Sequence, residues 1–102
     1  MIRISSNEGT TTIHVDGRFD YRCVAQFRAA LDTGARSWLV DLAQASYVDS
    51  AGLGMLLLLR ERVGNDASRV RLRGAKGQIL DVLMMAKFDR LFALDTSHDL
   101  RP

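Results

Sequence analysis

The chain has 102 residues, of which 47% are hydrophobic and 25% charged, and its formal net charge is +2. Such a composition is that of one ordinary globular domain with a single core, which excludes a disordered chain and a membrane protein. The small net charge does not by itself indicate a nucleic-acid partner. Cys23 is the only cysteine and the start of the chain lacks a secretory signal, so we expect one cytoplasmic domain over residues 1–102.

The start of the chain predicts an antiparallel hairpin. Apolar and polar residues alternate from Ile2 to Ser5 and again from Thr11 to Asp16, as in strands with one buried face. Asn7-Glu8-Gly9 between them has the composition of a turn. His14 falls on the polar face of the second strand, where we expect a solvated side chain.

A helix is predicted after Asp20, whose side chain is a suitable N-cap. Apolar residues recur there at helical spacing and form a stripe that faces the core. The stripe consists of Cys23, Val24, Phe27, Ala30 and Leu31. Gly34 lies where this helix ends, and the mostly apolar residues 38–42 then predict a strand in the middle of a sheet.

Helices and strands alternate through the second half of the chain. We expect a helix from about Ser50 to Gly64–Asn65, a strand over residues 70–73 and another helix from about Gly77. Apolar residues between Phe88 and Leu94 indicate a final short strand or helical turn, and the polar residues 96–102 are expected to fray.

This order of elements predicts an α/β fold. Its sheet is mixed and has four or five strands, with helices packed mainly on one face. The outward row of Arg69, Arg71 and Arg73 indicates that the other face is partly wet. Met84 and Met85 on the last helix are of a type that more often fills a core than forms an adaptable docking surface.

The turn over residues 49–54 has the most distinctive sequence, Asp49-Ser50-Ala51-Gly52-Leu53-Gly54. It joins the predicted central strand to a helix, and the side chain of either Asp49 or Ser50 can cap that helix. Gly52 and Gly54 each cost a helix about 1 kcal/mol against alanine. Two interpretations remain open: ordinary tight packing, or close approach of another group to this backbone.

The same residues resemble the signature of the STAS domains (sulfate transporter and anti-sigma factor antagonist). Val40-Asp41-Leu42, Tyr47-Val48 and Gly17-Arg18-Phe19-Asp20 extend the resemblance, which covers the chain from about Ile2 to Leu94. It is strongest to the free-standing bacterial anti-sigma factor antagonists. In that family the serine after the aspartate is phosphorylated, which implies Ser50 here. The next family position is usually serine or threonine, and this chain has Ala51.

The resemblance implies a phosphorylation-switched binding protein without catalytic residues or cofactor. Its expected partner is an anti-sigma factor with serine kinase activity, bound when Ser50 is free and released when Ser50 is phosphorylated. A PP2C-type phosphatase would reverse the modification. The implied partner-binding residues are Asp20, Asp49, Ser50, Ala51, Gly52, Leu53 and Gly54. The alternative is an accessory STAS subunit of a membrane lipid transporter, which serves as an assembly element and is not itself inserted in the membrane.

The sequence gives little support for hydrolysis, metal binding or RNA binding. A hydrolase would need Gly-x-Ser-x-Gly and a histidine base, but position 48 is valine, and His14 and His98 are the only histidines. No Cys or His pair has the spacing of a metal site, so no metal is expected. The arginine row lacks interleaved aromatic residues, so a solvated strand face is favoured over an RNA-binding surface.

Overall fold

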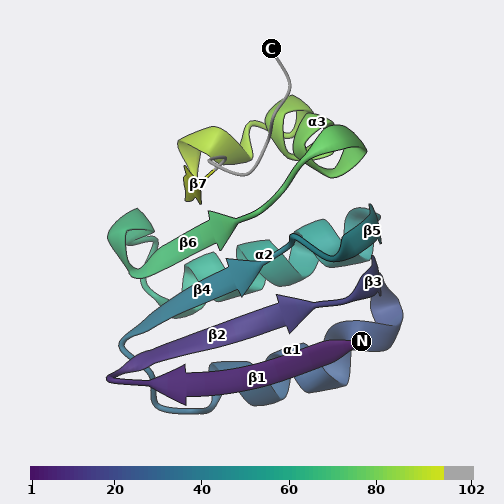
Figure 1. The fold of residues 1–102 in the computed structure, drawn as a ribbon. Coiled ribbons are helices and arrows are strands. Elements are labelled where there is room, and N and C mark those ends of the chain that lie inside the picture. Colours follow the sequence, from purple (N-terminus) through teal and green to yellow (C-terminus); the bar gives the residue numbers. More distant parts are fainter. Residues whose placement is uncertain (96–102) are drawn as a thin grey trace.

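The computed structural model describes residues 1–95 and forms the predicted mixed α/β fold (Figure 1). Five strands make the main sheet in the order β1-β2-β4-β6-β7. They are β1 (Ile2–Asn7), β2 (Thr10–Val15), β4 (Ser37–Asp41), β6 (Val70–Arg73) and β7 (Ala93–Asp95). β1 runs antiparallel to β2, which confirms the hairpin, and the remaining neighbours are parallel.

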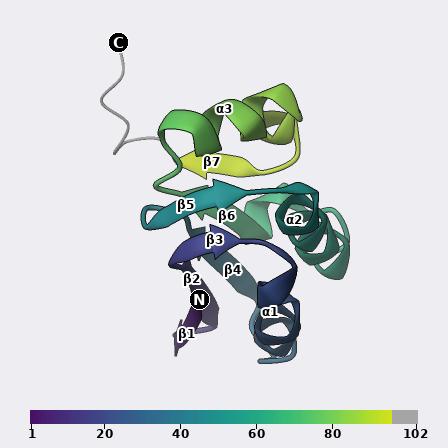
Figure 2. The ribbon, with the colours of Figure 1, turned by 90° about the vertical axis from the view of Figure 1, so that its right-hand side faces the viewer.

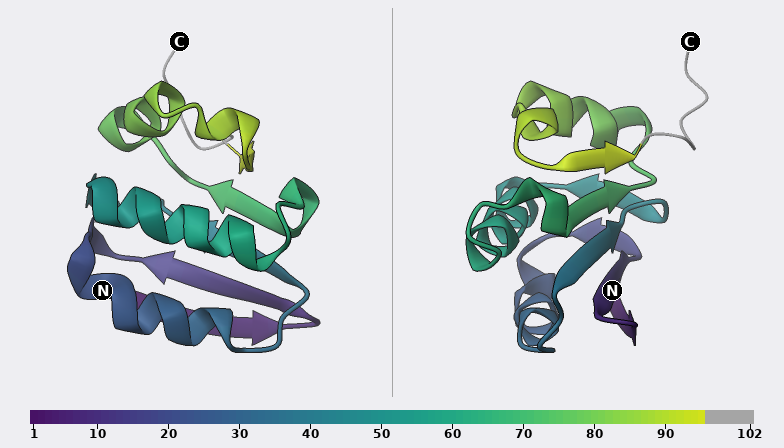
Figure 3. Two further views of the ribbon diagram at one scale, coloured as in Figure 1. Left: turned by 180° about the vertical axis from the view of Figure 1, so that it is seen from behind. Right: turned by 90° about the vertical axis from the view of Figure 1, so that its left-hand side faces the viewer.

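Helices α1 (Val24–Leu31) and α2 (Ser50–Arg62) lie side by side on one face of this sheet (Figures 2 and 3). The side chains of β2, β4 and β6 alternate, so that every second residue is buried beneath these helices. Phe27 of α1 and Leu56 and Leu59 of α2 are fully buried against the sheet. Helix α3 (Gly77–Met85) lies at the β6–β7 edge, so the predicted packing of helices mainly on one face is confirmed.

The opposite face of the sheet is uncovered, and several of its charged side chains are paired with one another. The strand register puts Arg3, His14, Asp41 and Arg73 in one row across four strands. Asp41 accepts a hydrogen bond from Arg73 at 2.9 Å and lies 3.4 Å from His14. His14 is therefore part of a paired row and not the freely solvated side chain that its position predicted.

The predicted row of three arginines is divided by the structure. Arg71 and Arg73 lie on the uncovered face, as their alternation with Val70 and Leu72 predicts. Arg69 lies in the 3₁₀ turn η2 (Ala67–Arg69), and its Nε donates a hydrogen bond to the Arg36 carbonyl at 2.7 Å. Arg69 thus ties two loops together.

A second sheet, of two short parallel strands, was not predicted. β3 (Gly17–Phe19) pairs with β5 (Ala45–Val48), two segments for which no strand was predicted. Strands of three and four residues are too short to show a period, and Ser46 and Tyr47 are exposed. Gly17 adopts φ +78°, a left-handed conformation that glycine tolerates, and this lets the chain turn from β2 into β3.

The later elements follow the predictions, except for the two methionines. α2 ends at Arg62, just before Gly64 and Asn65, which both have positive φ. The final apolar segment contains both predicted alternatives: a 3₁₀ turn, η3 (Phe88–Arg90), and strand β7. The core-filling interpretation of the methionine pair is wrong, because Met84 is 48% and Met85 83% exposed.

The predicted fraying of residues 96–102 lies outside the described residues. None of the helices within residues 1–95 combines the length and apolar character that crossing a bilayer requires.

Candidate functional site

An aspartate follows each strand of the small sheet and caps the helical segment that comes next. Asp20 follows β3 and precedes the 3₁₀ turn η1 (Tyr21–Cys23), which continues into α1. Asp49 follows β5 and precedes α2. Because Phe19 and Val48 are partners in the parallel register, the two aspartates lie at the same edge of the small sheet. The sequence-predicted residues of positions 20 and 49–54 are thus brought together.

Asp49, and not Ser50, caps α2. One carboxylate oxygen, Oδ1, accepts hydrogen bonds from the backbone N–H groups of Ala51 at 3.0 Å and Gly52 at 3.1 Å. These groups belong to the first helical turn and have no partner within the helix. Ser50 is the first residue of α2 and is exposed, and its hydroxyl makes no hydrogen bond within residues 1–95. The fold therefore leaves this hydroxyl available for chemistry.

The two glycines of the turn have different roles. A Cβ atom at Gly52 would lie 2.5 Å from the Phe19 carbonyl oxygen and 2.7 Å from a methyl group of Val48. Gly52 is therefore required where α2 packs on β3 and β5, which confirms the tight-packing interpretation. A Cβ atom at Gly54 would meet nothing within 4 Å, and this residue is exposed. The packing of the chain itself does not explain glycine at position 54.

Apolar residues occur on both sides of α2. Met55, Leu56 and Leu59 face the core and are buried. Ser50, Gly54 and Leu57 share the opposite side of the helix at spacings of four and three residues, and Leu57 is 44% exposed. Ala51 and Leu53 are partly buried beside this row. The serine therefore stands at one end of an exposed strip that is partly apolar.

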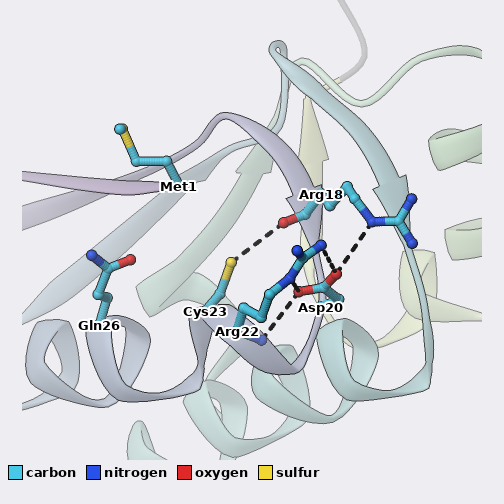
Figure 4. Close-up of a pocket in the computed structure, with 6 residues that line it drawn as sticks. All are labelled: Met1, Arg18, Asp20, Arg22, Cys23 and Gln26. Carbon is cyan, nitrogen blue, oxygen red and sulfur yellow. Dashed lines mark hydrogen bonds and ion pairs between the residues drawn. The ribbon is translucent and has the colours of Figure 1, made fainter.

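Asp20 is buried and fully engaged by arginines, as Figure 4 shows. Its carboxylate accepts hydrogen bonds from Arg22 Nη2 at 2.8 Å, Arg22 Nε at 3.2 Å and Arg18 Nε at 3.3 Å. It also caps η1 through the backbone N–H of Arg22. The Arg22 and Arg18 hydrogen bonds outweigh the cost of burial and lower the pKa of Asp20. Asp20 thus holds the turn in place and presents little of itself to a partner.

The two arginines are site residues that the sequence reasoning did not select. They line an open hollow of about 380 Å³ with Met1, Asp20, Cys23 and Gln26 (Figure 4). Arg18 also lies over the ring of Tyr47, 4.0 Å from its centroid. Their positions two residues before and after Asp20 were the available signal, since such spacing lets both side chains reach one carboxylate.

Ser50 is exposed, and no histidine contacts it within residues 1–95. The side-chain contacts of His14 are with Ser5 and Asp41 on the uncovered sheet face. Within residues 1–95, no three His, Cys, Asp or Glu side chains are grouped so that they could hold a metal ion. Ser50 lies at the positive end of the α2 dipole, which favours an anionic group, although the Ala51 and Gly52 N–H groups are already bonded to Asp49.

Comparison with known proteins shows the family of this chain. The family model described as "Mlab, STAS domain" matches residues 2–95. A STAS-domain-containing protein of Pseudomonas aeruginosa (strain UCBPP-PA14) is 37% identical over 86 residues, which cover 81% of this chain and 85% of the relative.

Solved structures share the fold at low sequence identity. The unphosphorylated form of the anti-sigma factor antagonist SpoIIAA is 20% identical, with a TM-score of 0.73 over 92% of this chain and 86% of that one. The phosphorylated form of SpoIIAA, from Bacillus, is similar with a TM-score of 0.73, at 19% identity over 96% and 94% of the two chains. A sulfate transporter family protein from Wolinella succinogenes is 14% identical, with a TM-score of 0.72 over 90% and 80%. The strand order, the Asp49–Gly54 turn and the matched family model lead to one conclusion: this chain belongs to the STAS domain family.

Proposed function

We propose that this domain is an anti-sigma factor antagonist that is switched by phosphorylation of Ser50. The observation that supports the proposal is that Asp49 and Ser50 have different roles at the turn. Asp49 makes the cap, so the fold leaves the neighbouring hydroxyl exposed and unbonded at the start of α2. A serine that the fold does not use can be modified without disturbing the fold.

Phosphorylation would change this surface by charge more than by shape. A phosphoryl group brings a charge of about −1.5 to −2 at neutral pH, and the Asp49 carboxylate is adjacent in the chain. A partner packed on the unmodified turn would then face a hydrated dianion and the cost of stripping water from it. The unphosphorylated protein would therefore bind the partner, and the phosphorylated protein would release it.

The exposed strip of α2 supplies the rest of the proposed contact. Gly54 has no side chain, so a partner's backbone can approach α2 closely at that point. Leu57 lies one turn further along and offers exposed apolar surface. Ser50, Gly54 and Leu57 thus form a continuous docking strip, with Ala51 and Leu53 beside it.

The chemistry of the switch would belong to the partner. In the proposed reaction the Ser50 Oγ attacks the γ-phosphorus of ATP held by a kinase-type anti-sigma factor. The bond to ADP breaks, and the hydroxyl proton passes to a base of the partner. A PP2C-type phosphatase would hydrolyse the phosphoserine. The domain itself acts as a binding protein and substrate, and needs no cofactor of its own.

Phosphorylation mapping combined with affinity capture tests the proposal. We would purify the protein from its own cells, map its phosphorylation, and identify the proteins captured by wild type, Ser50→Ala and Ser50→Asp. We expect one phosphoryl group at Ser50, and a kinase-type anti-sigma factor captured by the Ala form and lost from the Asp form. Ser46→Asp is the matched control, because Ser46 is exposed on β5 four residues earlier. It should retain the partner.

One outcome would favour the transporter alternative. A STAS subunit that serves as an assembly element of a lipid transporter does not require a serine switch. Capture of an ATP-binding cassette complex by all forms equally, with Ser50 unmodified under every growth condition, would contradict the proposed switch and support that alternative.

A further inference from the structure

We propose that Arg18 is the built-in counter-ion of the switch: when Ser50 is phosphorylated, Arg18 leaves Asp20 and binds the phosphoryl group. This inference rests on the proposed function, because it concerns the phosphorylated state of Ser50. It assigns the two arginines of the Asp20 cluster to different tasks.

Arg18 lies against β5, the strand that leads to Ser50. In the parallel register Arg18 pairs with Tyr47, and its guanidinium lies over the Tyr47 ring at 4.0 Å from the centroid. Tyr47 precedes Ser50 by three residues, so the two Cα atoms are at most about 10 Å apart. An arginine and a phosphoserine side chain can together bridge that distance. Arg22 approaches Asp20 from the opposite side, as Figure 4 shows.

The two arginines hold Asp20 with unequal strength. Arg22 makes three hydrogen bonds to the carboxylate, two of them from its guanidinium in a bidentate arrangement, with Nη2 at 2.8 Å. Arg18 makes one, at 3.3 Å. Loss of Arg18 would leave the buried carboxylate paired and its cap intact. Loss of the Arg22 side chain would remove both bidentate bonds and leave only the longer bond from Arg18 and the backbone cap, so Arg18 is the arginine that can change partners.

A phosphoryl group competes well for this guanidinium. It carries up to twice the charge of a carboxylate and presents three strong acceptor oxygens, which arginine can contact in a bidentate manner. The charged groups that face it are Asp49, which repels it, and the Asp20 cluster, in which two cations share one anion. Arg18 is more than half exposed, at 55%, so the movement requires no repacking of the core.

The consequence is a change in the surface beyond the phosphate itself. In the unmodified protein Arg18 covers the partly exposed ring of Tyr47 and presents a positive charge on the small sheet. In the phosphorylated protein that charge is neutralised against the phosphate. A partner that contacts the covered Tyr47 ring or the Arg18 charge would lose that contact when Ser50 is phosphorylated.

A ³¹P NMR titration of protein with phosphoserine placed at position 50 during synthesis tests this inference. The second pKa of a phosphoserine is ordinarily about 6. Pairing with Arg18 lowers it, so Arg18→Gln should raise the titration midpoint by a few tenths of a pH unit relative to wild type. Arg71→Gln is the matched control, because Arg71 is an exposed arginine on the uncovered sheet face. Its midpoint should equal that of wild type.

A second measurement needs no variant. The Nε–Hε resonance of Arg18 should move when Ser50 is phosphorylated, while that of Arg22 should stay. Equal midpoints for wild type and Arg18→Gln, or an Arg18 resonance that does not respond, would overturn the inference. Because the phosphoserine is introduced synthetically and no partner is present, this result is independent of the capture experiment that tests the proposed function.

Discussion

The turns at Asp20 and Asp49 are built alike but used differently. Each follows a strand of the small sheet, and each aspartate has extended backbone, with φ −133° and ψ −167° at Asp20 and φ −122° and ψ −170° at Asp49. Each accepts a hydrogen bond from a backbone N–H two residues further along. Beyond the cap they differ, because Asp20 is buried with two arginines while Asp49 bonds only the first turn of its helix.

The difference is that the first motif is used for structure, whereas regulation is proposed at the second. The Asp20 carboxylate forms ion pairs with Arg22 and Arg18, and the residue that follows it begins a 3₁₀ turn. At Asp49 the following residue is an exposed serine that the fold does not need. The first turn anchors the second through Gly52, whose backbone lies against the Phe19 carbonyl.

The largest effect is expected where the two turns touch. Gly52→Ala places a methyl group 2.5 Å from the Phe19 oxygen, which forces the end of β3 and the start of α2 apart. We expect the free energy of unfolding to fall by about 1–3 kcal/mol, measured by urea denaturation, even though alanine is the better helix former.

Gly54→Ala is the control for this comparison. No atom lies within 4 Å of the added methyl group, so helix propensity alone should act and raise stability by up to about 1 kcal/mol. If both substitutions stabilise the protein, the contact between the two turns is not rigid, and the distinction between the glycines fails.

The contribution of the Asp20 charge to the stability of the fold is expected to depend on pH. Asparagine keeps the cap but removes the anion, so Asp20→Asn should be less stable than wild type at neutral pH. The folded pKa of Asp20 is lowered, mainly by Arg22, so its contribution is present above the unfolded pKa of about 4 and is lost as the pH falls below it.

The stability gap between wild type and Asp20→Asn should therefore narrow in acid. Thermal unfolding of both proteins between neutral pH and pH 3 measures this. The lowered pKa values of Asp16, Asp41 and Asp66 affect both proteins alike and cancel in the difference. A gap that is the same at every pH would mean that Asp20 contributes as a cap and not as a charge.

The sequence was sufficient for the main fold because its signals are periodic. β2 and α1 have alternation or a helical stripe, and both were predicted with the correct buried side, including Phe27 and Ile13. The β3–β5 pair was missed because three or four residues carry no period, and their pairing joins segments far apart in the chain. The exposure of Met84 and Met85 was missed because methionine fits either a core or a surface.

The Asp49–Gly54 turn of the candidate site was predictable in its residues, whereas Arg18, Arg22 and the contacts of the turn were not. Residues 49–54 stand out because aspartate, serine and glycine gather at a strand-to-helix junction. Which of Asp49 and Ser50 caps the helix depends on backbone angles that the sequence leaves open, since both side chains are good caps. The different roles of Gly52 and Gly54 depend on where Phe19 lies, and that position is set by the unpredicted small sheet.

The smallest expected effect is the most informative about Ser50. Asp49→Ala removes two hydrogen bonds to the first turn of α2 and should cost about 1 kcal/mol of stability. Ser50→Ala removes a hydroxyl without a hydrogen bond and should change stability by less than about 0.5 kcal/mol. Urea denaturation of both variants measures the contrast. A loss at Ser50→Ala as large as at Asp49→Ala would show that the hydroxyl supports the fold, and phosphorylation there would then disturb the structure itself. If Ser50→Ala leaves the free energy of unfolding unchanged but the partner is no longer released, the hydroxyl is needed for regulation and not for the fold.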